Sequence, residues 1–110
     1  MESLAVTWAR VRQRALRAQG VVAQATGVPQ NQLCAPARGG TKAAFARQMA
    51  MYLCHAVYRM TLHQVACAFG RDPTTVARAI RIVERQRADP DLDRTLRWLE
   101  AMLRRDGRLA

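Results

Sequence analysis

The residues with the clearest chemical potential lie between positions 69 and 87, in the segment FGRDPTTVARAIRIVERQR. Its first part combines a glycine, an aspartate, a proline and two threonines, and its later part is rich in arginine. Guanidinium groups suit phosphates and base edges, and threonine hydroxyls bond to either, so one surface carrying these groups would bind a polyanion. In the simpler alternative, the aspartate and threonines only cap a helix and the arginines only solvate it.

Other reactive side chains form weaker patterns. His63 and Cys67 are four residues apart and Cys54 precedes His55, so these groups could supply metal ligands. Their expected places on packed helices favour small buried cysteines instead. The closely spaced aspartates of the segment ADPDLD are typical of helix-start charges, and no Ser-His-Asp or Cys-His spacing indicates catalysis. We therefore expect no enzymatic activity, no cofactor and no metal.

Composition and charge favour a nucleic-acid partner. The chain has 110 residues and a net charge of +10, and seventeen of its eighteen basic residues are arginine. Such a balance indicates nucleic acid ahead of a membrane. Three cysteines without a CxxC pair, and an N-terminus without a continuous apolar stretch, favour the reducing cytoplasm, at the nucleoid. We expect no membrane partner and no small-molecule substrate.

No alternating strand pattern occurs, so the spacing of apolar residues predicts an all-α, compact helical bundle. The first helix is expected to weaken or break at Gly20 and to end by Gly27 and Pro29. A short helical turn in PQNQLC and a loop APARGGT precede a long helix over about residues 42–57. A last helix follows ADPDLD and is expected to close the core rather than form a dimer seam. The apolar stripe of the first helix comprises Leu4, Trp8, Val11 and Ala15. The apolar stripe of the last helix comprises Leu92, Leu96, Leu99 and Leu103.

Between these helices the sequence predicts two more, joined by a tight turn. Thr61 and Gln64 form a capping box at the start of the first one. Gly70 stands where a helix C-terminus requires a left-handed residue. Asp72 and Pro73 then suit the N-cap and the first position of a new helix. A turn of about three residues makes the helices cross steeply, which is the geometry of a helix-turn-helix.

Two faces separate when residues 72–88 are placed on a helical wheel. The apolar face comprises Val76, Ala79, Ile80 and Val83, and the opposite face comprises Thr74, Arg78, Arg81 and Arg85, with Arg71 and Thr75 at its edge. A helix of this kind can enter a major groove with its N-terminus first. There Asp72 could accept a hydrogen bond from a cytosine amino group.

Two segments resemble the C-terminal DNA-binding domain (domain IV) of the bacterial replication initiator DnaA. They are ARQMAMYL, at 46–53, and MTLHQVACAFGRDPTTVARAIRIVE, at 60–84, and VVAQATGVPQNQLC looks like the opening helix pair of that domain. The resemblance implies an all-α fold with a Trp-repressor-like helix-turn-helix. It also implies double-stranded DNA as the partner, read as asymmetric DnaA boxes by a recognition helix in the major groove and a basic-loop arginine in the minor groove.

The resemblance carries site residues over by position. Asp72, Thr74 and Thr75 match the signature of the family for base and phosphate contacts. Arg47 and Gln48 match residues that approach the DNA backbone at the start of the long helix.

Two departures from the family affect the expected specificity. Where the family usually has histidine, this sequence has Pro73, which can donate no hydrogen bond to a base. The arginine-rich loop of the family is thinned to ARGGTK, which leaves Arg38 and Lys42 as candidates for the minor-groove arm. The resemblance therefore implies weaker or altered recognition of the DnaA box.

We expect an N-terminal amphipathic basic helix over 1–19, the DnaA-like domain over 20–106 and a tail over 107–110. The first helix could pack on its own domain, dock a protein or lie on a membrane, and the first of these is preferred. The sequence contains no GxxxxGK[ST] loop, so the expected role is origin-site binding that regulates replication initiation. The alternatives are an adaptor for the initiator or the helicase, and a transcriptional regulator.

Overall fold

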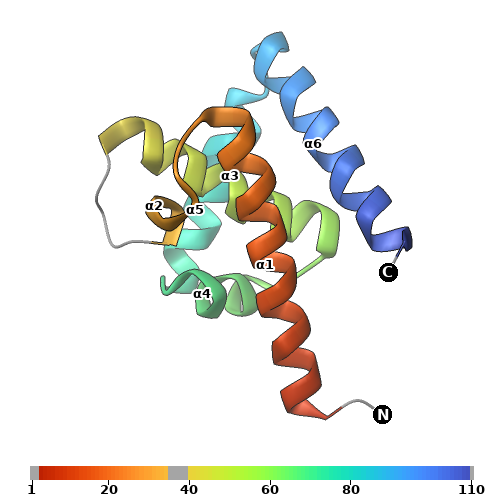
Figure 1. Cartoon of the computed structure of the whole chain (residues 1–110). Coiled ribbons are helices and arrows are strands. Elements are labelled where there is room, and N and C mark those ends of the chain that lie inside the picture. Colours follow the sequence, from red (N-terminus) through yellow and green to blue (C-terminus); the bar gives the residue numbers. More distant parts are fainter. Residues whose placement is uncertain (1–2, 35–39, 110) are drawn as a thin grey trace.

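Six helices make up the fold in this computed structural model, which describes residues 3–34 and 40–109 (Figure 1). They are α1 (Leu4–Thr26), α2 (Gln30–Cys34), α3 (Gly40–Tyr58), α4 (Leu62–Phe69), α5 (Pro73–Gln86) and α6 (Pro90–Leu109). Within those two ranges there is no strand, and no helix is both long and apolar enough to cross a bilayer. The predicted all-α bundle is confirmed, and the long helix extends two residues before and one residue after its expected bounds.

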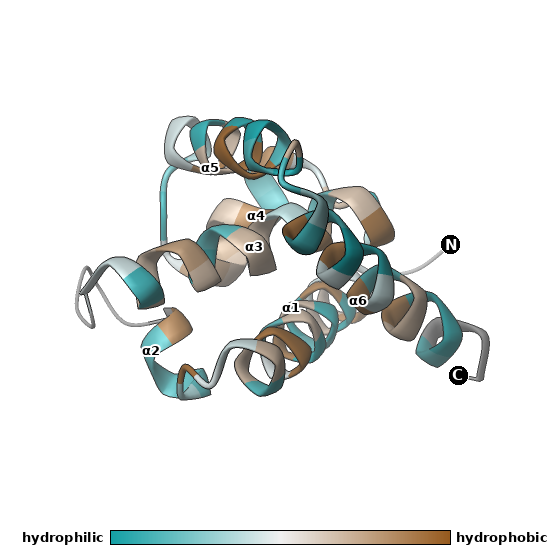
Figure 2. Ribbon diagram, turned by 90° about the horizontal axis from the view of Figure 1, so that it is seen from above, coloured by the Kyte–Doolittle hydropathy of each residue, from teal (hydrophilic) through white to brown (hydrophobic). Residues whose placement is uncertain are grey.

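The helices lie in three layers when the molecule is seen from above (Figure 2). α3 and α4 form the middle layer, α5 covers one side of it, and α1 and α2 lie on the other side, while α6 runs from the end of α5 down beside α1. α3 therefore packs against α1 on one side and against α5 on the other. This order leaves the outer side of α5 uncovered by the first helix.

α1 is one continuous helix of 23 residues, which differs from the break considered at Gly20. Ser3 caps its start by accepting a hydrogen bond from the Val6 N–H at 3.2 Å, and Gly27, with φ of 76°, caps its end after Thr26. A single interior glycine weakens a helix by only about 1 kcal/mol. Here the burial of Val21 and Val22 directly after Gly20 compensates for it. The boundary expected between 19 and 20 thus falls inside a helix.

The first helix packs against its own domain, as preferred. Val11, Ala15 and Ala18 are buried against α3 and α4. The Arg14 guanidinium lies over the ring of Tyr58, 5.3 Å from its centroid, and adds a cation–π contact between α1 and α3. The positive charge of Arg14 is therefore engaged in a contact within the protein.

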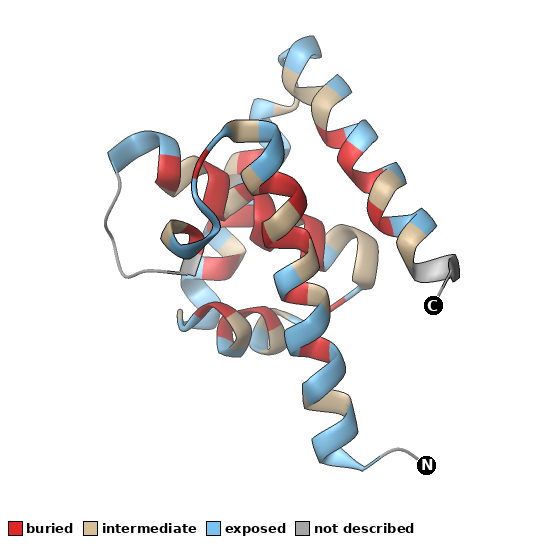
Figure 3. Cartoon of the chain, in the orientation of Figure 1, coloured by how far each residue is buried: buried red, intermediate tan, exposed pale blue. Residues whose placement is uncertain are grey.

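α6 closes the core through its leucine stripe. Leu96, Leu99 and Leu103 are completely buried, and the buried stripe on α6 faces the other helices in Figure 3. Leu92 is half-buried. Trp98 lies outside this stripe, with 59% of its surface exposed. The expectation that this helix closes the core is confirmed.

Candidate nucleic-acid interface

The turn between α4 and α5 is built from local backbone requirements. Gly70 has φ of 64°, and its N–H and that of Arg71 both donate to the Ala66 carbonyl, the latter at 3.0 Å. These bonds satisfy the end of α4 and reverse the chain at once. At the start of α4, Thr61 and Gln64 form the predicted capping box, with bonds of 3.1 and 3.0 Å. The predicted helix-turn-helix is confirmed.

Asp72 caps α5 with both carboxylate oxygens. Oδ1 accepts the Thr75 N–H at 2.9 Å and Oδ2 accepts the Thr75 hydroxyl at 3.2 Å. The hydrogen bond from the Thr75 backbone is the main cause that lowers the pKa of Asp72, so this carboxylate is charged at neutral pH. Asp72 is exposed and retains lone pairs toward solvent. Pro73 follows at the first helical position, as predicted.

The two faces of α5 separate as the sequence predicts. The apolar residues Val76, Ala79, Ile80 and Val83 are buried, and the polar residues Thr74, Thr75, Arg78, Arg81 and Arg85 are exposed. At 1.5 Å per residue, the exposed face from Thr74 to Arg85 is roughly 16 Å long. The exposed carboxylate of Glu84 lies on the same helix among these arginines. Arg71 is half-buried, and its Nη1 is 3.5 Å from the Gly70 carbonyl.

A buried polar cluster anchors the end of α5, which sequence reasoning missed. The Arg87 Nε donates to Asp93 at 2.7 Å, and its Nη1 donates to the Tyr52 hydroxyl at 2.8 Å and to Glu100 at 3.2 Å. Burial acts to lower the pKa of Arg87, but the hydrogen bonds to Asp93, Glu100 and Tyr52 outweigh it and raise the pKa. Arg87 thus joins α5 to α3 and α6, which holds the exposed face of α5 in a fixed direction.

Arg47, which the resemblance predicts to approach the DNA backbone, is buried in this structure. Only 6% of its surface is exposed. Its Nε donates to the Leu33 carbonyl at 3.1 Å, and its Nη2 donates to the Gln32 carbonyl at 2.7 Å. Because these bonds turn the guanidinium toward α2, Arg47 links α2 to α3 and presents little surface to a phosphate.

Two of the remaining predicted contacts, Lys42 and Gln48, lie in the first half of α3. Lys42 is exposed, and its ammonium group lies near Gly27. A Cβ atom built on Gly27 would be 3.9 Å from the Lys42 Nζ. Gln48 is half-buried. Arg38, the other candidate for the minor-groove arm, lies outside the described residues. The structure therefore brings the predicted contact residues of the turn and α5 together on one exposed polar surface, with Lys42 on a separate element.

The sequence predicts small buried cysteines, but of Cys54 and Cys67 only Cys54 is buried. Cys54 is buried, and this burial raises the pKa of its thiol to about 12. Cys67 is exposed, because it points away from the stripe that α4 buries, and its Sγ lies 3.8 Å from the His63 Nε2. In the part of the chain that is described, no three His, Cys, Asp or Glu side chains are grouped to hold a metal.

Comparisons with known proteins agree with this geometry. The family described as the bacterial dnaA protein helix-turn-helix matches residues 17–83. No curated protein matches the chain.

Among solved structures, a crystal structure of a DNA replication initiation factor is 29% identical, with a TM-score of 0.81, and the match covers 94% of this chain and 32% of that chain. A replication initiator DnaA bound to AMPPCP and single-stranded DNA is also 29% identical, with a TM-score of 0.70, and the match covers 97% of this chain and 31% of the other. The chain therefore spans about a third of each of these two proteins.

Proposed function

The chain belongs to the family of bacterial DnaA helix-turn-helix domains, and from this premise we propose that it binds double-stranded DNA sequence-selectively. The observation that carries the proposal is the exposed face of α5, where Thr74, Arg78 and Arg81 point away from the core. The layer order supports it, because α1 lies on the far side of α3 and α4 and does not cover this face. A major groove about 12 Å wide admits one helix of this size.

The side chains of this face divide into two roles. Thr74 is exposed and makes no side-chain hydrogen bond within the described residues, so its hydroxyl and methyl can both meet base edges. Arg78 and Arg81 lie further along α5 and would contact phosphates or guanine edges. Asp72 and Thr75 already bond to each other, so their first role is to fix the N-terminus of α5, which itself favours a phosphate.

At the level of the cell, we propose that the protein occupies sites read by the initiator at the nucleoid and so regulates replication initiation. This role needs binding alone and no catalysis. In support, the matched family is defined by the helix-turn-helix of the initiator. Footprinting of origin DNA with the initiator present would test it, because added protein should displace the initiator from shared sites. Unchanged initiator footprints at saturating protein would argue against this role.

The DNA-binding proposal is tested by salt dependence and by charge-matched variants. If about six phosphates are contacted, the plot of log binding constant against log salt should have a slope of about −5. The double variant Arg78→Gln with Arg81→Gln should reduce this slope by about 2 and abolish sequence preference. Arg94→Gln with Arg104→Gln removes the same charge from exposed positions on α6 and should change binding little. Equal losses in both double variants would show that binding is a general effect of net charge.

A further inference from the structure

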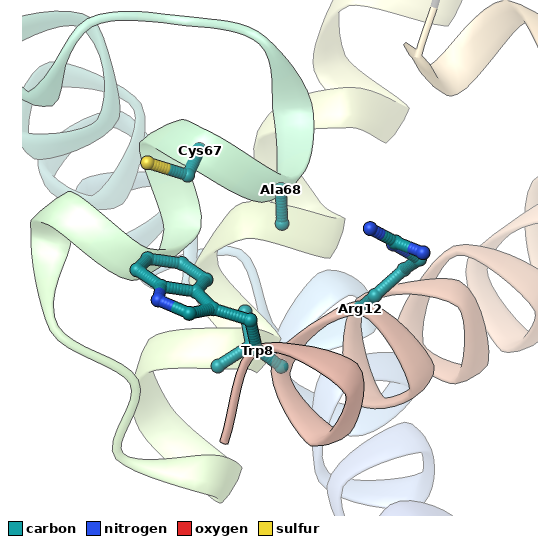
Figure 4. A pocket seen from close by; sticks show the side chains of 5 residues that line it. Trp8, Arg12, Cys67 and Ala68 are labelled. Atoms are coloured by element: carbon teal, nitrogen blue, oxygen red, sulfur yellow. The ribbon is translucent and has the colours of Figure 1, made fainter. Parts of the chain in front are cut away.

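A pocket of about 270 Å³ lies between the first half of α1 and α4 (Figure 4). It is lined by Trp8, Val11 and Arg12 from α1 and by Cys67 and Ala68 from α4. Its wall thus combines an aromatic ring, an aliphatic group, a cation and a thiol. This volume is slightly below the range of about 300–1,000 Å³ that is usual for ligand sites, so it fits a group of a few heavy atoms.

The thiol in this wall is placed for reaction. Cys67 is exposed, and its Sγ is 3.8 Å from Nε2 of His63, one helical turn earlier. The ring of Trp8 meets the His63 ring edge to face, with centroids 6.3 Å apart, which positions the imidazole beside the pocket. The imidazole can take the thiol proton as a thiolate forms. Cys54 is fully buried and has no such access.

Arg12 gives the pocket a preference for negative charge. Its side chain is exposed, and it makes no ion pair or side-chain hydrogen bond with the residues that the structure describes. α1 contains no acidic residue to neutralise it. In Figure 4 the guanidinium of Arg12 lies at the opposite end of the pocket from the Cys67 sulfur. A ligand with a reactive sulfur at one end and a carboxylate at the other would match both groups.

We propose that this pocket is a thiol-modification site, in which Cys67 forms a mixed disulfide with small disulfides that carry a carboxylate. His63 accepts the thiol proton, and the Cys67 thiolate attacks one sulfur of the ligand. The Cys67–ligand S–S bond forms as the S–S bond of the ligand breaks, and the departing thiolate takes the proton from His63. Cys67 is oxidised and the released half of the ligand is reduced to a thiol. Arg12 holds the carboxylate of the half that remains.

Three disulfides of similar size and different charge test the proposal. These are 3,3′-dithiodipropionate, which is anionic, bis(2-hydroxyethyl) disulfide, which is neutral, and cystamine, which is cationic. The full chain is incubated with each, quenched with acid and digested with trypsin. The peptides 18–38, 48–59 and 60–71 each contain one of the three cysteines, so mass spectrometry follows each site separately. We expect the adduct on 60–71 and none on 48–59.

The selectivity of Cys67 is tested with two arginine variants of equal charge. Arg12→Gln should lower the rate with dithiodipropionate about threefold, the effect of one exposed ion pair, and leave the rate with the neutral disulfide unchanged. Arg94→Gln is the control, because Arg94 lines a separate pocket beside Ala25, roughly 25 Å along α1 from Trp8. His63→Asn should slow modification by all three disulfides.

Two results would overturn the proposal. One is absence of an adduct on 60–71 with dithiodipropionate. The other is an equal loss of rate in the Arg12 and Arg94 variants, which would mean that only the net charge of the protein attracts the probe. Neither result depends on DNA binding.

Discussion

The Arg87 guanidinium donates to the Glu100 carboxylate at 3.2 Å, with only 17% and 11% of the two side chains exposed. This pair joins the end of α5 to the middle of α6, and Tyr52 of α3 completes the contact. The direction of the exposed face of α5 therefore depends on a bond network at its far end, as well as on the turn at its start.

Replacing Arg87 by methionine should lower the free energy of unfolding by about 2–3 kcal/mol. The substitution leaves the Glu100 carboxylate in a largely buried site without its cation, and breaking a fully buried pair typically costs about 3–5 kcal/mol. Urea unfolding followed by circular dichroism measures the change. Arg97→Gln is the matched control, because the Arg97–Asp93 bridge of 2.9 Å is mostly exposed on the arginine side and should contribute less than about 1 kcal/mol. Similar losses in the two variants would refute a special role for Arg87.

Acid should destabilise the protein through Asp93. The hydrogen bond from Arg87 is the main cause that holds the pKa of Asp93 below its ordinary value. A carboxyl group whose pKa is lower in the folded state stabilises the protein above its unfolded pKa, and this contribution is lost as the pH falls through the folded pKa. Stability should thus be constant near neutrality and fall below about pH 4.

Urea unfolding of the wild type and Asp93→Asn at pH 7 and pH 3 measures this effect. The asparagine variant should be less stable than the wild type at pH 7, and the difference between the two should shrink at pH 3. Asp72 also has a lowered pKa, but it is present in both proteins. Its contribution to the pH dependence of stability therefore cancels when the two are compared. A difference that stays constant between the two pH values would contradict the assigned cause.

The sequence predicts the turn and the two faces of α5 well because both depend on local rules. Gly70 and Asp72 act on backbone groups within three or four residues, and the apolar period of α5 directly gives its buried side. The contacts of Arg47 could not be read from the sequence, because its long side chain crosses from α3 to the carbonyls of α2, which no local rule contains. A signal was nevertheless present, since Arg47 precedes Ala50 and Met51 by three and four residues, and both of these are buried.

The buried polar cluster around Arg87 also left a signal in the sequence. Glu100 follows Leu96 by four residues on the buried stripe of α6, and a carboxylate in such a place requires a cation. The identity of that cation could not be read from the sequence, because Arg87 comes from another helix. Cys67 was expected to be buried although its position is off the stripe of α4, and its exposure follows from the helical period alone.

Two glycine substitutions should have opposite effects on stability. Gly70→Ala places a side chain at φ of 64°, and this conformation should lower the free energy of unfolding by about 1–2 kcal/mol, although the added Cβ would meet no atom within 4 Å. Gly20→Ala lies inside α1, where its Cβ would meet the Gln30 Oε1 at an ordinary 3.6 Å. It should raise the free energy of unfolding by about 0.5–1 kcal/mol. Thermal and urea unfolding of both variants check this pair, and a loss of stability in Gly20→Ala would indicate that α1 bends at this position.

Pro73 should reduce recognition of the DnaA box, because it stands where the family usually has histidine and can donate no hydrogen bond to a base. The variant Pro73→His should bind a box-containing duplex about 5- to 150-fold more tightly than the wild type, which corresponds to about 1–3 kcal/mol for one base contact. Affinity for a scrambled duplex of the same length should not change, because the helix dipole and the arginines are unaltered. Fluorescence anisotropy at one fixed salt concentration measures both affinities, and urea unfolding checks that both proteins are folded. Selection of an unmodified box by the wild type from random DNA, as its tightest site, would show that Pro73 imposes no such loss.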